Sequence, residues 1–172
     1  MDYSSLMMNR RSCRQFLNHT ISPEAVEAIL KAALLAPSSR NRHTTRFVVA
    51  DSQELMMRLA DAKESGAAFL RHAPLAVVIA DNPLLNDCWV EDGSIAAFAM
   101  QCQAHDLGVA SCWVQIRERY LSDGTKSEDV VKGIVGLEEA DRVLCIIAFG
   151  IPAHDAPPHD EESLKWENVV LR

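Results

Sequence analysis

A chain of 172 residues, of which 48% are hydrophobic, is long enough to form one domain with a buried core. Its formal net charge of -7 argues against nucleic-acid binding, because contacts along a phosphate backbone need a broad basic surface. The longest apolar runs, residues 75–80 and 143–149, are far shorter than the roughly 20 residues that span a bilayer, and residues 1–5 lack the pattern of a secretory signal. We therefore expect residues 1–172 to form a single cytoplasmic domain that binds neither nucleic acid nor a membrane.

Helix and strand signals alternate along the first half of the chain. Ser22 can act as an N-cap and Pro23 as a first-turn proline, and apolar residues then recur at steps of three and four up to Leu34. Pro37 ends this helix. After it, the pattern predicts strands at residues 47–50 and 75–80, separated by short helical segments at 52–63 and 66–72.

The segment Ser94 to Leu107 differs from an ordinary surface helix because apolar side chains surround nearly its whole circumference. Such a helix must be buried on almost every side. Two interpretations remain open: the helix packs against the same helix of a second subunit, or it is the central helix of a monomer. The pattern then predicts a strand at 109–116, a helix at 125–135 and a last core strand at 143–149.

A cluster of basic residues stands near the start of this acidic chain. Arg10, Arg11 and Arg14 lie with Ser12 within five positions. Each guanidinium stays charged and offers a planar fork of donors that can bind two phosphate oxygens at once. The cluster therefore indicates a phosphate site, with a solvated basic turn near the N-terminus as the alternative.

The sequence gives no sign of metal-dependent or nucleophilic catalysis. Its five cysteines, at positions 13, 88, 102, 112 and 145, form no C-x-x-C pair and no zinc-like spacing with histidine. We find no Ser-His-Asp set and no paired carboxylates either. We therefore expect no metal site and no side chain that acts as an indispensable acid, base or nucleophile.

Five separated segments resemble the FMN-dependent nitroreductase family and follow the family order. These segments are RRSCRQF at 10–16, APSSRN at 36–41, Ala-Pro at 73–74 before an apolar strand, LGVASCW at 107–113 and FGIP at 149–152. The resemblance covers essentially the whole chain. It implies an α+β nitroreductase-like fold, with a central, mainly antiparallel sheet flanked by helices, and a homodimer with shared flavin sites.

The resemblance also implies which residues bind FMN. Arg10, Arg11 and Ser12 would bind its phosphate, and Arg14 would reach the N1/O2 edge of the ring, where negative charge accumulates on reduction. A fixed guanidinium at this edge favours the reduced flavin. Lys165 is the candidate for a further cation near the phosphate, with a solvated tail lysine as the alternative.

A second group of residues would contact the flavin ring. The first segment of this group corresponds to the family segment that reaches the flavin from the other subunit. Its asparagine, Asn41, offers both a hydrogen-bond donor and an acceptor to the polar edge of the ring. Another segment lies after the buried helix and would border the flavin. The residues are Pro37, Ser38, Ser39 and Asn41 for the first segment, and Cys112 and Trp113 for the second.

The chain departs from the family pattern around the substrate pocket. Where relatives often continue with x-Q-P-W, this sequence has His43-Thr44-Thr45. Val114-Gln115 stands where a glycine often lies against the flavin. Residues 82–92 are also too few for the long helical excursion of larger members. These departures leave the shape of the substrate pocket open.

The expected activity is hydride transfer from NADH or NADPH through FMN to a small acceptor such as a nitroaromatic or a quinone. The cofactor would carry the chemistry, which explains why the sequence shows no catalytic side-chain set. Two alternatives stay open. One is a specialised flavin enzyme of the same fold with a dedicated substrate, and the other is a non-catalytic flavin-binding protein.

Overall fold

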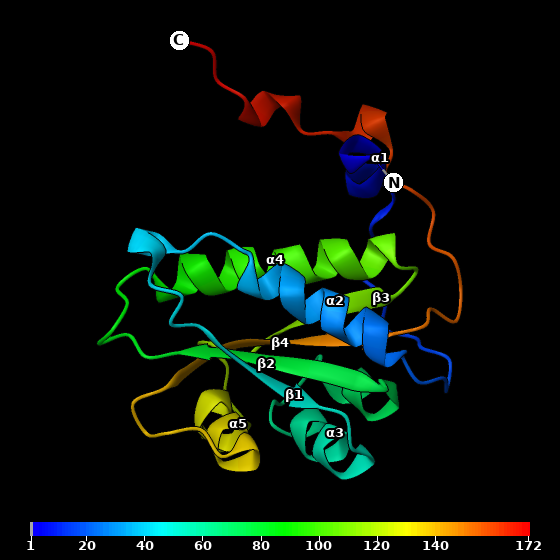
Figure 1. Ribbon diagram of the computed structural model, residues 1–172. Helices are drawn as coiled ribbons and strands as arrows, with labels where there is room; N and C mark the ends of the chain where they lie inside the picture. The colour runs from blue at the N-terminus through cyan, green and yellow to red at the C-terminus, as the bar shows by residue number, and fades with distance from the viewer. Residues whose placement is uncertain (1) are drawn as a thin grey trace.

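Four antiparallel strands form the central sheet of the computed structural model, which describes residues 2–172 (Figure 1). The strand order is β1-β2-β4-β3, so the last strand of the chain is inserted between two earlier ones. The structure confirms the strand predictions to within one residue at each end. The strands are β1 Arg46–Ala50, β2 Leu75–Asp81, β3 Ala110–Gln115 and β4 Arg142–Gly150.

Helices cover both faces of this sheet. Figure 1 shows α2 and α4 on one face and α3 and α5 on the other, and the short helix η2 packs in the same layer as α3. The fold is therefore α+β with an antiparallel sheet between helical layers, as predicted. The elements are α1 Tyr3–Asn9, α2 Pro23–Leu34, η1 Ser39–Asn41, α3 Gln53–Ala60, η2 Ala68–His72, α4 Trp89–Asp106 and α5 Ser127–Val135.

The apolar side chains of β2 pack into two hydrophobic cores, one on each face of the sheet. Because side chains alternate along a strand, Val77 and Ile79 pack under α2 and α4, whereas Val78 and Ala80 pack toward α3 and α5. Every residue of β2 is buried. This confirms the prediction of a strand covered on both faces.

Helix α4 begins five residues before the start that the sequence predicts. The sequence predicts Gly93 just before the helix, whereas the structure places Gly93 inside it. The helix packs so closely on the sheet at this point that only a residue without a side chain fits. A Cβ at this position would lie 2.8 Å from a methyl group of Leu144. Ala97 and Met100 are fully buried within this one chain, whereas Ile95 is 44% exposed. One side of α4 is therefore left uncovered by its own chain.

Residues 153–172 leave the body of the molecule and run beside α1 before turning away from it (Figure 1). The His159 N–H donates to the Met8 carbonyl at 2.8 Å, which ties the start of this tail to α1. The tail contains only the short helices η3 Glu161–Ser163 and η4 Trp166–Asn168. Its apolar side chains are exposed, as Leu171 shows with 92% of its surface open to solvent.

No helix in the described part of the chain, residues 2–172, combines the length and apolar character needed to cross a membrane.

Gly150 controls how the segment 10–16 packs, and this provides a test of the fold. A Cβ at position 150 would lie 2.6 Å from a ring atom of Phe16. Gly150→Ala should therefore lower the free energy of unfolding by about 1–3 kcal/mol, the cost of overpacking. Gly133→Ala in α5 is the matched control, because a Cβ there meets nothing within 4 Å, and it should raise that free energy by about 0.5–1 kcal/mol. Urea denaturation measures both variants, and equal effects would contradict the packing of Phe16.

Candidate functional site

The arginine-rich segment lies in an extended conformation across one end of the sheet. Ser12 forms a parallel bridge with Ser111 in β3, and the Cys13 N–H donates to the Ser111 carbonyl at 3.0 Å. Phe16 forms an antiparallel bridge with Pro152, just after β4. Backbone bonds from two sides therefore fix the points from which the side chains of this segment project.

Arg10 and Arg14 lie against opposite helical layers. The guanidinium carbon of Arg10 is 5.8 Å from the ring centre of Phe98 on α4, and that of Arg14 is 6.0 Å from the ring centre of Phe69 in η2. Neither arginine forms an ion pair with a carboxylate of residues 2–172. Within the described residues, these two guanidinium charges at the end of the sheet are thus outside any ion pair.

A cavity of about 290 Å³ opens beside Arg10. Arg10 Nε and His105 Nε2 belong to residues that line this cavity, and both atoms are buried without a hydrogen-bond partner in the described chain. Buried polar atoms are rarely left unpaired in folded proteins, so these two mark a place where a polar ligand would supply the missing bonds. Arg11 differs, because its Nη1 already donates to the Pro157 carbonyl at 2.6 Å.

A second cavity, also of about 290 Å³, follows the same segment. Ser12 and Arg14 line it, and His154 and Asp155 line both cavities. Arg10 and Arg11 therefore line one cavity, and Ser12 lines a neighbouring cavity together with Arg14.

Cys112 lies in β3, directly beside this segment. Burial raises the pKa of its thiol above the ordinary range, and the smaller opposing effects of the Arg14 charge and of a Ser12 hydrogen bond do not cancel this rise. The thiol is therefore protonated at neutral pH and is a poor nucleophile. Trp113, the next residue, donates from its indole nitrogen to Gln115 Oε1 at 2.9 Å.

Residues 37–43 form a tight loop after α2. Arg40, Asn41 and His43 have φ angles of 53°, 55° and 49°, in the left-handed region that residues other than glycine rarely adopt. The His43 N–H donates to the Ser38 hydroxyl at 3.0 Å, and its ring atom Nε2 lies 2.8 Å from Asn41 Oδ1. The loop part of the second predicted group is thus presented by a strained and well-bonded segment, whereas Cys112 and Trp113 of that group lie in β3.

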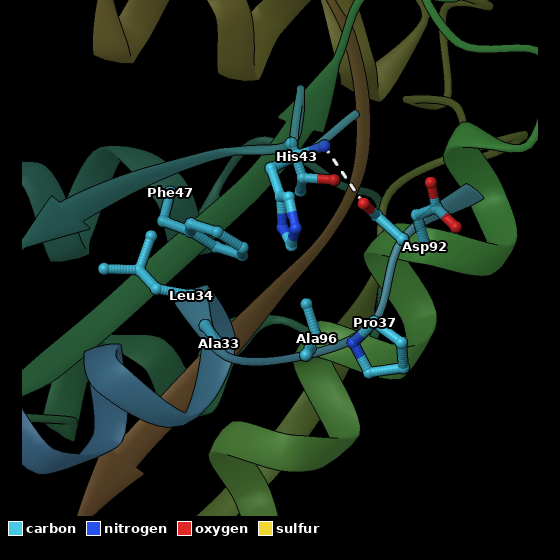
Figure 2. Close-up of a pocket in the computed structure, with 10 residues that line it drawn as sticks. Ala33, Leu34, Pro37, His43, Phe47, Asp92 and Ala96 are labelled. Carbon is cyan, nitrogen blue, oxygen red and sulfur yellow. Dashed lines mark hydrogen bonds between the residues drawn. The ribbon is translucent and has the colours of Figure 1, made fainter. Parts of the chain in front are cut away.

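A pocket of about 160 Å³ lies beneath this loop (Figure 2). Figure 2 shows Leu34 of α2, Ala96 and Asp92 of α4, and the side chains of His43 and Phe47 around it. The pocket is therefore mostly apolar, with an imidazole and a carboxylate at its edge. It occupies the region where the sequence departs from the x-Q-P-W pattern of relatives.

Helix α4 contacts the loop 37–43 and the arginine-rich segment at different points along its length. Near its start, Asp92 accepts the Ser39 N–H of the loop at 2.9 Å. Phe98 and His105, which lie beside the arginine-rich segment, follow at about 9 and 20 Å farther along the axis, at 1.5 Å per residue. Within one chain the loop and the arginines are therefore attached at separate points along α4.

Lys165 lies in the tail, where its ammonium group is exposed and 3.6 Å from the Glu167 carboxylate. Its role as a further cation stays a prediction.

Sequence reasoning did not identify three residues that the structure brings to these groups: Asp92, His105 and Ser111. His105 and Ser111 lie in or beside the LGVASCW segment, so that motif contained a signal for them. Asp92 gave none, because a carboxylate in the first turn of a helix is common and its partner is far away in the sequence.

The comparison with known proteins identifies the family. The family model described as the Nitroreductase family matches residues 7–68 and 61–151. A protein of Archaeoglobus fulgidus, provisionally named NADH dehydrogenase/NAD(P)H nitroreductase, is 30% identical over 151 residues, which cover 86% of this chain and 83% of that protein. The chain belongs to the nitroreductase family, as its motifs indicated.

Solved structures agree with this assignment. An FMN-dependent nitroreductase from Clostridium difficile matches with a TM-score of 0.94 and 36% identity over 96% of both chains. A structure from Desulfovibrio desulfuricans, described as a provisional nitroreductase in complex with FMN, matches with a TM-score of 0.78 over 98% of this chain and 95% of that one. At 21% identity, the second match supports the fold alone.

The environment of Cys112 gives a test that needs no activity assay. In the folded protein without FMN, iodoacetamide should alkylate Cys112 at least about tenfold more slowly than in urea, because a buried and protonated thiol offers little thiolate. Cys13, which is only half-buried, serves as the internal control and should react first. Peptide mass spectrometry after timed quenching measures both rates. Modification of Cys112 as fast as Cys13 would show that β3 exposes this thiol.

Proposed function

We propose that this chain is an FMN-dependent oxidoreductase that takes a hydride from NADH or NADPH and reduces a small acceptor such as a nitroaromatic or a quinone. The observation that carries the proposal is the arginine-rich segment, which is fixed on β3 and carries unpaired positive charge toward two cavities. Family membership supports it, and so does the 36% identical C. difficile structure named as an FMN-dependent nitroreductase.

The residues at this end of the sheet suit FMN chemically. Arg10 and Ser12 offer donors to a phosphate, and the unpaired, buried Nε of Arg10 is the kind of atom that an anionic ligand satisfies. Arg14 forms no ion pair with a carboxylate of residues 2–172, so its positive charge is available to the ring edge. When bound, FMN supplies the redox chemistry of hydride acceptance and electron delivery. Arg11 contributes through its charge and holds the tail through Pro157.

The protein side chains then bind, orient and provide charge, and none needs to act as an acid, base or nucleophile. The protonated Cys112 thiol next to the arginines fits this role, because it packs without reacting. Protons can come from solvent. We infer that residues 1–172 act together as one domain in this chemistry.

We further propose that the active form is a homodimer with two shared sites. Within one chain the loop 37–43 and the arginines are attached at separate points along α4, and a second copy would complete each site. Ile95 on the uncovered side of α4 is 44% exposed and Leu107, just after the helix, is 43% exposed, so both offer apolar surface to a second copy. The exposed apolar tail offers another surface of the same kind.

One observation keeps a second candidate in view. The pocket under the loop lies where the family sequence pattern is lost, and it is lined by His43, Thr45 and Phe47. A specialised flavin enzyme with a dedicated substrate would use such a defined pocket. Steady-state oxidation of NADH and NADPH by the FMN-loaded protein, with nitroaromatic and quinone acceptors, separates the candidates. Turnover with several acceptors supports a general reductase. Turnover with neither nitroaromatics nor quinones supports the dedicated enzyme or a flavin-binding protein.

Replacing the two arginines tests the flavin grip. Arg10→Ala and Arg14→Ala should each weaken FMN binding by about 1.5–3 kcal/mol, the value of one hydrogen bond to a charged group. Only Arg14→Ala should also lower the reduction potential of the bound flavin, because it removes charge from the ring edge. The control is Arg58→Ala, an exposed arginine on α3. Fluorescence titration and spectroelectrochemistry measure the two effects. Wild-type affinity for FMN in both test variants would refute the proposed role of these arginines in FMN binding.

A further inference from the structure

A buried polar network lies behind the loop 37–43. The Asp92 carboxylate is only 5% exposed, and each of its oxygens is 2.9 Å from the Ser39 N–H, which donates to them. The buried Asn86 donates from its amide to Asp92 at 2.8 Å and to Asp81 at 3.4 Å. We call Asp81, Asn86 and Asp92 the buried triad.

The triad holds the loop on both sides. Asp81 Oδ2 accepts the hydroxyl groups of Thr44 at 3.0 Å and Thr45 at 3.2 Å, just after the loop, whereas Asp92 holds Ser39 near its start. The three residues with left-handed φ angles lie between these two attachments. A conformation that such residues rarely adopt persists only where the surrounding structure imposes it, and the triad supplies that constraint.

Fold stability alone explains the triad poorly. Asp81 and Asp92 are both buried, and neither forms an ion pair with a basic side chain of residues 2–172. Burying two carboxylates is costly, and apolar side chains would join α4 to the sheet at lower cost. Their hydrogen bonds go instead to residues 39–45, to Asn86 and, for Asp81, to the backbone N–H of Asn82 at 2.8 Å. This distribution points to a role in shaping the loop.

We propose that Asp92 is a positioning residue for the shared flavin site. By holding the Ser39 N–H, it fixes the conformation in which Ser38, Ser39 and Asn41 would contact FMN in the other subunit. The His43 ring already pairs with the side-chain oxygen Oδ1 of Asn41. The side-chain amide nitrogen of Asn41 therefore remains for an acceptor atom of the flavin. Figure 2 shows Asp92 on α4 close to this loop. The inference rests on the proposed function.

Asp92→Asn tests this role, because it keeps the side-chain volume and replaces one acceptor oxygen by an NH₂ group. That group would face the Ser39 N–H or the Asn86 amide, which are both donors. FMN binding to the protein stripped of flavin should weaken at least about tenfold, as expected for loss of a hydrogen bond to a charged group. The visible circular dichroism of FMN bound at saturation should change as well.

Val131→Ala is the matched control for a general loss of stability. Val131 is fully buried in α5, on the opposite face of the sheet. At a comparable fall in Tm, this variant should keep the wild-type affinity and the wild-type dichroism of bound FMN. Wild-type behaviour of Asp92→Asn would overturn the proposal, and so would an equal loss of affinity in Val131→Ala.

If Asp92→Asn does not fold, Thr45→Val decides the question. This variant removes one hydroxyl bond to Asp81 and nearly preserves shape. Weakening of FMN binding by about threefold or more would support the positioning role, because the loop loses one of its bonds to the Asp81 carboxylate, and wild-type affinity would overturn it. Absence of FMN binding by the wild-type chain would instead contradict the proposed function.

Discussion

The pairing of residues 10–16 with the end of the sheet is the constraint on which the rest of the site depends. The bridge between Ser12 and Ser111 turns a segment close to the N-terminus into part of the scaffold, and Phe16 packs so closely on Gly150 that no side chain fits there. Two guanidinium groups are thereby held in fixed places on an acidic protein. Fixed charge is what a flavin site needs, because it costs no reorganisation when electrons arrive.

Helix α4 sets the second constraint. Its buried side joins the sheet, its early turns hold the loop through Asp92, and its later turns lie under Arg10 and beside the first cavity. The same rigid element therefore contacts both the loop 37–43 and the arginine-rich segment, at separate points along its length. We expect two copies to associate through the exposed side of α4. Because the shared site would be completed by the same contact, association and completion of the site would be one event.

The sequence alone predicted the strands and most helices because their signals are local: caps, prolines and apolar periodicity. The start of α4 was missed because Gly93 looks like a break, although close packing on Leu144 requires it inside the helix. The motifs also predicted both groups of candidate flavin-binding residues. They gave no sign of the bond between Ser39 and Asp92, which are 53 residues apart, or of the cavity shared by Arg10 and His105, because such contacts exist only in the folded chain.

The central claim, that each flavin site is built from two copies, is tested most directly by mixing subunits. Arg14→Ala and Asn41→Ala chains, carrying different affinity tags, are co-expressed, and the mixed dimer is purified through both tags. If the sites are shared, each variant alone binds FMN weakly, whereas the mixed dimer has one site with both residues intact and binds one FMN tightly per dimer. A mixed dimer with the same weak binding as either parent would contradict the account.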